Sequence, residues 1–131
     1  MIENIVPEGL ILKGVYTPAK KIDLGDRYLI FVSGVQAPAG DIEEVSTLDI
    51  AEQTELIFQE IDMTLKQAGA SIDDVVKAVI YLKDINDFNI VSPIRAKYFK
   101  NSMPVSTMVG GASFVRAGSK IEIEVTAIIN K

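Results

Sequence analysis

Two carboxylates near the C-terminus, Glu122 and Glu124, are the clearest candidates for chemistry in the sequence. Apolar residues alternate with charged or polar ones from 121 to 129, and this strict period of two is typical of a strand with one buried face. Glu122 and Glu124 then share the other face, where a carboxylate can hold a water molecule, act as a general base or bind a ligand. A solvated strand carboxylate is the simpler interpretation of both residues.

The sequence contains no cysteine and no histidine. Thiol nucleophiles, disulfides and thiolate metal ligands are therefore excluded, and so are the commonest general base and metal ligand of proteins. The chemistry has to come from carboxylates, Lys, Arg, Tyr, Ser, Thr, backbone amides or bound water. We expect neither a metal nor a cofactor.

Length and composition predict one globular domain that spans residues 1–131. Apolar residues make up 48% of the chain and charged residues 24%, which is an ordinary balance for such a domain. No apolar run approaches the length of a membrane span, and the N-terminal residues lack the pattern of a signal peptide, so we expect a cytoplasmic protein without membrane contact. The net charge is −5 and the basic residues are scattered, which counts against a nucleic-acid partner.

The clearest helix is predicted for residues 49–68, which carry a continuous apolar stripe. Asp49 and Glu52 resemble an N-terminal capping pair, and Gly69 supplies the stop.

A second helix is predicted for roughly residues 87–100, where Pro93 is awkward in the interior because it lacks an N–H group. Ser92 as the N-cap and Pro93 as the first helical residue would resolve the conflict. Residues 87–91 would then form a separate turn.

Four regions carry strand patterns. They are residues 22–32, with two strands around a Gly25-Asp26 turn that end at Ser33-Gly34, residues 75–82, residues 104–115 with a Gly110-Gly111 bend, and the central strand 120–129. The order of strands, helix, strand, helix and two strands indicates an α+β fold, with a mixed sheet and both helices on one face. The uncovered face is expected to be buried against other subunits.

Five short motifs are distributed over nearly the whole chain. They are Gly14-Val15-Tyr16, Phe31-Val32-Ser33-Gly34-Val35-Gln36, Lys83-Asp84-Ile85-Asn86-Asp87-Phe88, Pro104, and Ile121-Glu122-Ile123-Glu124-Val125 with Ala127. Each motif is weak alone, but in this order and spacing they resemble the RidA/YjgF family, which is also called endoribonuclease L-PSP.

The resemblance implies a chorismate-mutase-like fold that assembles as a homotrimer, with the sheets forming an inner barrel and with three clefts between subunits. It also implies a hydrolytic deaminase, which converts reactive enamines and imines to a keto acid and ammonia. By motif, Glu122 would position the attacking water, and Tyr16 with the Ser33-Gly34 turn would line the pocket. Phe88, which also fits a core position, would help to wall the cleft.

One motif departs from the family pattern. The resemblance implies Pro-x-Arg-Ser, with the Arg binding the substrate carboxylate, whereas this chain reads Pro104-Val105-Ser106-Thr107. A hydroxyl cannot replace the charge of a guanidinium, and the loss of such a contact costs on the order of 2–5 kcal/mol. Ser106, with Thr107 and Met108 beside it, is therefore expected to bind a different substrate, unless these residues only pack locally.

Two classes of function remain open at this point. The first is a deaminase that acts on an enamine or imine without the Arg. The second is a non-catalytic trimer that binds a small metabolite such as a keto acid in the same clefts, or that regulates a partner. The missing Arg favours the second class, whereas Glu122, Tyr16, Ser33 and Gly34 favour the first, which we expect. Ribonuclease activity fits poorly with an acidic chain that has no histidine.

Overall fold

The computed structural model describes residues 1–10, 12, 14–37, 45 and 47–131. The sequence also predicts a loop over residues 36–45, which lies mostly outside these described residues. The elements are β1 (Ile2–Ile5), β2 (Ala19–Asp23), β3 (Arg27–Val35), α2 (Ile50–Gln67), η1 (Ile72–Asp74), β4 (Val75–Leu82), η2 (Ile85–Asp87), α3 (Phe88–Phe99), β5 (Val105–Val109) and β6 (Ile121–Asn130).

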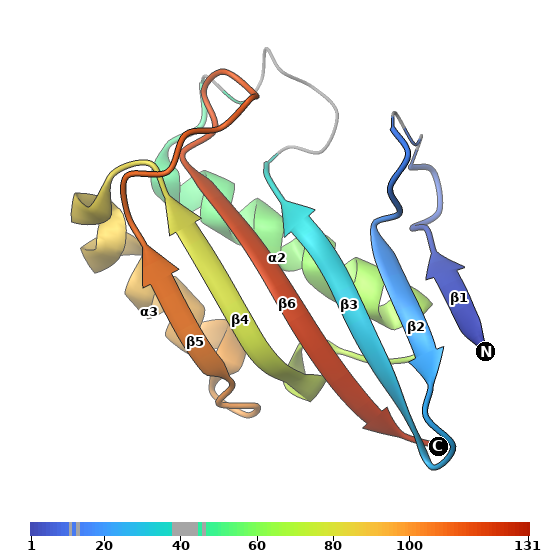
Figure 1. Cartoon of the computed structure of the whole chain (residues 1–131). Helices are drawn as coiled ribbons and strands as arrows, with labels where there is room; N and C mark the ends of the chain where they lie inside the picture. The colour runs from blue at the N-terminus through green and yellow to red at the C-terminus, as the bar shows by residue number, and fades with distance from the viewer. Residues whose placement is uncertain (11, 13, 38–44, 46) are drawn as a thin grey trace.

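The six strands form one mixed sheet in the order β1-β2-β3-β6-β4-β5 (Figure 1). β6 lies between β3 and β4 and is antiparallel to both. β4 and β5 are parallel, with α3 as the crossover between them. The C-terminal strand is therefore central, as the sequence pattern predicts.

The alternation along β6 separates the two faces of the sheet. Ile121, Ile123, Val125 and Ala127 are buried in the core, whereas the residues between them are only partly buried. Figure 1 shows α2 and α3 together behind the sheet, on the face that these four residues share. The predicted mixed sheet with both helices on one face is confirmed.

The first long helix, α2, begins and ends where the sequence predicts. The Asp49 side chain accepts from the backbone N–H of Glu52 at 2.8 Å, and the Glu52 side chain accepts from the backbone N–H of Asp49 at 3.2 Å, which completes a capping box. Gly69 follows the C-cap with a φ of +84°, a conformation that side chains with a Cβ rarely adopt.

Aromatic side chains join the two helices on the covered face. The ring of Phe58, which is fully buried in α2, stacks on Tyr98 of α3 at 4.6 Å and meets Phe99 edge to face at 5.2 Å. Truncation of such a buried ring to Ala costs about 3–5 kcal/mol.

The predicted start of α3 at Ser92 is wrong. The helix begins at Phe88 and continues through Pro93, and the turn that precedes it is η2, which ends at Asp87 and not at Val91. Pro93 removes one backbone donor, which would have bonded the carbonyl of Asn89, but both residues are exposed, so water can replace the missing partner.

The strand boundaries also differ from the prediction in four places. β2 begins at Ala19 and not at residue 22, because Lys20 and Lys21 interrupt its apolar pattern. β1 was not predicted, because its four residues have a single buried side chain and so carry no alternation. β5 ends at Val109, so the predicted segment 104–115 is a strand only in its first half. β3 does not end at Ser33-Gly34 but continues to Val35.

The face of the sheet away from the helices is open in the single chain. Apolar side chains are exposed there, and they include Phe31 of β3, 47% exposed, and Val109 of β5, 45% exposed. Over the described residues the six strands do not close into a barrel. The described helices are too short or too polar to cross a bilayer.

Candidate functional site

A β-bulge shapes the end of β3 next to β6. Val32 pairs with Val125 and Val35 pairs with Ile123, so Ser33 and Gly34 together lie opposite the single residue Glu124. A bulge of this kind inserts one extra residue, increases the local twist and changes the direction of side chains. The bulge explains why the expected strand end at Ser33-Gly34 is an irregularity within a longer strand.

The carboxylate of Glu122 lies directly on the backbone of Gly34. A Cβ added at Gly34 would be 2.6 Å from Glu122 Oε1 and 2.8 Å from Glu122 Cδ, which is closer than real Cβ contacts come. Gly34 has no positive φ, so its lack of a side chain serves this close approach and not an unusual backbone conformation.

Two polar side chains continue the contacts of Glu122. The Gln36 amide donates from Nε2 to Glu122 Oε1 at 3.3 Å, and its Oε1 accepts from the hydroxyl of Ser119 at 2.7 Å. Ser119 is buried, whereas Gln36 and Glu122 are partly buried. Glu122 thus lies in a defined polar cluster with Gly34, Gln36 and Ser119, which we call the Glu122 cluster.

Glu124, the second carboxylate on this face, has a different partner. The Tyr81 hydroxyl donates to Glu124 Oε1 at 2.5 Å. This hydrogen bond, with desolvation and the charges of Glu124 and Glu122, raises the pKa of Tyr81. Tyr81 therefore stays a neutral donor to Glu124, whereas the donor to Glu122 is the amide of Gln36.

Ser33 precedes Gly34 in the bulge and bonds to the segment that follows Tyr16. The Ser33 hydroxyl donates to the carbonyl of Thr17 at 2.9 Å, and its backbone N–H donates to the carbonyl of Pro18 at 2.8 Å. These bonds attach the segment that follows Tyr16 to the bulge. The Tyr16 side chain itself is 68% exposed, which suits a residue that meets a ligand or a second chain.

Ser106 is not brought to Glu122 within the chain. It pairs with Ala78, which is buried under the helices, so its side chain lies on the helix face of the sheet. Its hydroxyl accepts from Arg95 Nη1 of α3 at 3.3 Å, and Arg95 also donates to Ser92 at 3.4 Å. Although position 106 lacks a guanidinium, α3 supplies one beside it.

The other residues predicted for the pocket lie on the edge strand β5 or at the start of α3. Thr107 is exposed and pairs with Val79, which places it on the open face, whereas Met108 packs partly against the core. Phe88 begins α3 and is 43% exposed, so it is not the core residue that its helical position suggested. A single chain therefore holds Glu122, Ser33 and Gly34 together, and it holds Ser106, Thr107 and Met108 separately.

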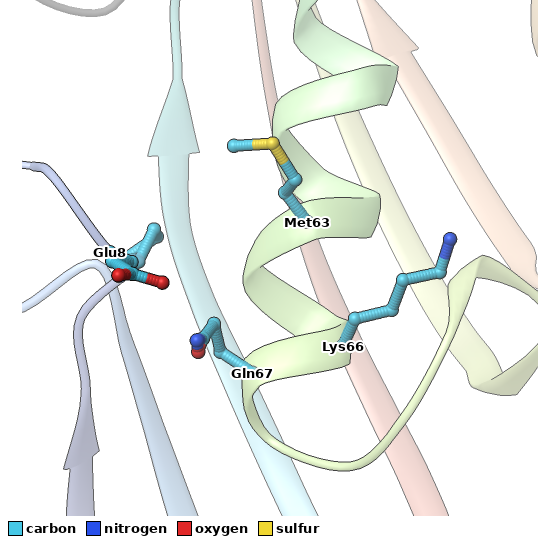
Figure 2. Close-up of a pocket in the computed structure, with 5 residues that line it drawn as sticks. Glu8, Met63, Lys66 and Gln67 are labelled. Carbon is cyan, nitrogen blue, oxygen red and sulfur yellow. The ribbon is translucent and has the colours of Figure 1, made fainter.

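One shallow hollow of about 350 Å³ lies elsewhere on the described surface, between the segment after β1 and the end of α2. Figure 2 shows Glu8 and Gln67 on opposite sides of it, with Met63 above and the Lys66 side chain extending away. Lys66 forms an ion pair with Asp62 at 2.7 Å. None of the residues predicted for the site lines this hollow, so it does not mark the same site.

The described residues include no group of three or more acidic side chains arranged to hold a metal ion. The arrangement at Glu122 instead suits proton transfer to or from a bound water, since one carboxylate oxygen is oriented and the site is only partly buried.

Sequence reasoning missed Gln36, Ser119 and Arg95 as site residues. Gln36 was within a quoted motif, but nothing in the spacing from 36 to 122 reveals a contact. Arg95 lies on the face of α3 toward Ser106, a relationship that depends on how the helix packs and not on the strand pattern.

The arrangement of this sheet and its two helices occurs in solved structures of known proteins. A Rid family protein from Yersinia pestis has a TM-score of 0.79 and 31% identity, with 98% of this chain and 100% of that chain covered. A member of the YjgF/YER057c/UK114 family from Mycobacterium tuberculosis has a TM-score of 0.78 and 29% identity, with coverage of 98% and 100%.

Sequence comparison identifies the family. Residues 13–129 match the model of the family described as Endoribonuclease L-PSP, and the chain belongs to this family. A RutC family protein of Pyrococcus abyssi is 36% identical, with 90% of this chain and 87% of the relative covered. The human 2-iminobutanoate/2-iminopropanoate deaminase is 34% identical, with coverage of 88% and 82%. The chain is therefore a RidA-type protein, as its motifs predict.

Proposed function

We propose that this protein is a hydrolytic deaminase of reactive enamines and imines, with a substrate range altered at Ser106. The observation that carries the proposal is the placement of Glu122, whose carboxylate lies against the bare backbone of Gly34 and accepts from Gln36 at 3.3 Å. The human relative named 2-iminobutanoate/2-iminopropanoate deaminase supports the reaction class.

The chemistry requires one general base and one water molecule. Glu122 takes a proton from the water molecule as the water oxygen adds to the carbon of the C=N bond. The imine nitrogen gains a proton in the same step. The resulting carbinolamine loses ammonia, and its hydroxyl oxygen becomes the carbonyl of the product. Water is consumed, and one imine yields one carbonyl compound and one ammonia. An enamine first takes a proton on carbon to give the imine.

The altered substrate range follows from the neutral side chain at position 106. A 2-imino acid carries a carboxylate, and Ser106 offers it a hydroxyl in place of a charge. Backbone amides from Ser106 to Met108 can steady the substrate, and Tyr16 and Phe88 provide apolar walls. We expect substrates that need less carboxylate binding than those of the human relative.

We also propose that the active form is a homotrimer with the site at each interface. Glu122 and Ser106 lie on opposite faces of one sheet, so a neighbouring chain has to bring the two sides of the cleft together. The exposed apolar side chains of the open face, such as Phe31 and Val109, suit burial between chains. The small-molecule ligand is an imine, an enamine or the keto acid product.

The test is a deaminase assay on purified protein. An amino acid oxidase generates imines in situ from several amino acids, and semicarbazide traps what is left, so faster disappearance reports turnover. Glu122→Gln is expected to lower the rate about 10²- to 10⁴-fold, because it removes the general base. Glu124→Gln is the matched control on the same strand and face, and it should retain most activity.

Ser106→Arg distinguishes the altered substrate range from a loss of function. If wild type turns over imines and Ser106→Arg shifts the preference toward 2-imino acids, the proposal holds. If wild type turns over none of the imines but binds a keto acid, the non-catalytic trimer is favoured instead. The neutral side chain of Ser106 is the observation that supports this alternative.

The proposed assembly has its own test. Native mass measurement should give three times the 14.3 kDa of one chain. Phe31→Asp should dissociate the assembly, because it buries a charge on the open face, whereas Met63→Asp on the exposed side of α2 should leave it intact. A monomer in wild type would refute the trimer.

A further inference from the structure

A chain of hydrogen bonds connects the first turns of α2 to Glu122. It begins at Gln53, which is fully buried, and passes through the segment 118–120 to Gln36. None of these residues needs to touch a substrate.

Gln53 fixes the backbone on both sides of Ser119. Its Nε2 donates to the carbonyl of Gly118 at 3.0 Å, and its Oε1 accepts from the backbone N–H of Lys120 at 3.0 Å. The same amide also donates to the carbonyls of Val45 and Leu48, each at 3.2 Å. A buried amide with all of its groups bonded allows little movement of the segment it holds.

Ser119 in turn holds the Gln36 amide in the orientation that the Glu122 carboxylate requires. The Ser119 hydroxyl donates to Gln36 Oε1 at 2.7 Å, which leaves the NH₂ group of Gln36 to point at Glu122. The opposite orientation would place the amide oxygen against a carboxylate, where two acceptors repel one another. The amide is thus held as a donor to Glu122.

A donor held in this way keeps the Glu122 carboxylate in one orientation, and a general base has to be oriented toward the water from which it takes a proton. The donor also occupies Oε1 and leaves Oε2 for the reacting water. Gly34 also limits the movement of the carboxylate toward β3, because Glu122 Oε1 lies only 2.6 Å from the point where a Cβ of residue 34 would be.

We propose that Gln36, held by Ser119, is the positioning residue that keeps the Glu122 carboxylate directed toward the substrate. The proposal rests on the function proposed above for Glu122. It goes beyond that function because it assigns a role to two residues that act through Glu122 and not on the substrate.

Other titratable groups face Glu122 and have to be considered. Tyr81 of β4 lies opposite it in the register, and Glu124 follows on the same face of β6. Lys120 precedes it by two residues in the same alternation. Substitutions at Gln36 and Ser119 leave all three unchanged, so a change in the behaviour of Glu122 can be assigned to the lost amide.

The experiment measures kcat and KM separately, together with Tm, in wild type, Gln36→Leu and Ser119→Ala. Gln36→Leu keeps the approximate volume and removes the donor, so kcat should fall about 10-fold while KM changes little. Ser119→Ala should lower kcat by less, because the amide then loses one of its two hydrogen bonds. A kcat in Gln36→Leu equal to that of wild type would overturn the assignment. Gln67→Leu and Ser113→Ala are the exposed controls.

A second readout works without turnover. The side-chain couplings of Glu122, which report its χ angles, are measured by NMR at one pH in wild type and in Gln36→Leu. Couplings that are averaged over several rotamers in Gln36→Leu but not in wild type support the assignment, whether or not the protein turns over an imine. Unchanged couplings overturn it, even if Gln36→Leu is less stable or less active. If wild type turns over no imine, the proposed function is refuted, and the NMR result alone shows whether Gln36 positions Glu122.

Discussion

Gly34→Ala is the sharpest test of the proposed site, because the structure predicts that it impairs function more than folding. The new Cβ would lie 2.6 Å from Glu122 Oε1, and ordinary contacts begin at 3.4 Å, so the carboxylate has to move by about 0.8 Å. Glu122 can swing its flexible end at a cost of about 0.5–1.5 kcal/mol. The movement breaks or lengthens the 3.3 Å bond from Gln36.

A displacement of this size at a reacting group lowers kcat/KM by about 10- to 100-fold. The loss of stability should be small, with Tm falling by roughly 2–6 °C. Both are measured on one preparation, with the semicarbazide assay for activity and thermal unfolding for stability. In a Glu122→Ala background the added methyl group should have little further effect on either quantity.

Gly110→Ala is the matched control with the reverse outcome. There the new Cβ would lie 2.5 Å from Ile85 Cβ and 3.1 Å from Ile85 Cα, and neither atom belongs to a flexible end. We expect Gly110→Ala to lose about 1–3 kcal/mol of stability and to retain most of its turnover once folded. Full activity in Gly34→Ala, or equal unfolding of the two variants, would refute the reasoning.

Three further predictions concern the helices. Gln53→Leu should lower the free energy of unfolding by about 1–3 kcal/mol, because it leaves the partly buried Lys120 N–H without its partner; urea unfolding beside Gln67→Leu measures this, and equal midpoints would contradict it. Burial and a neighbouring carboxylate raise the pKa of Tyr98 to about 12, so above pH 10.0 the unfolded chain loses a proton that the folded chain keeps. Stability should therefore fall as pH rises from 10.0 toward 12, and Tyr98→Phe should flatten this slope; a slope that persists in the variant would show another cause. Arg95→Ala should change KM for 2-imino acids no more than KM for imines that lack a carboxylate, because Arg95 donates to Ser106 and Ser92 on the helix face of the sheet; a selective rise of KM for 2-imino acids would show a carboxylate contact and contradict the altered substrate range.

The sequence predicts those parts of the fold that local patterns determine. The period of two in β6 and the capping box of α2 each follow from neighbouring residues, and both are confirmed. The start of α3 was missed because a rule about proline was applied without knowing that Asn89 faces solvent. β1 was missed because an edge strand with one buried residue has no periodic signal.

The site was less accessible to prediction than the fold. Family motifs point to Glu122, Ser33 and Gly34, and the structure places Gly34 against the Glu122 carboxylate. The partners of Glu122 depend on two contacts that join residues more than eighty positions apart, from Gln36 to Glu122 and from Gln36 to Ser119. Such pairings arise from the sheet register and its bulge, which a single sequence does not reveal.

The buried Gln53 side chain has a consequence for how the molecule opens. The N–H of Lys120 bonds to a side chain of α2 and not to a neighbouring strand, so it can exchange its hydrogen only when the start of this helix opens. The helix start and the segment that leads into β6 then belong to one cooperative unit of local unfolding. Amide exchange at Lys120 should therefore match that of the first turns of α2 more closely than that of β5, although β5 is nearer in the sequence.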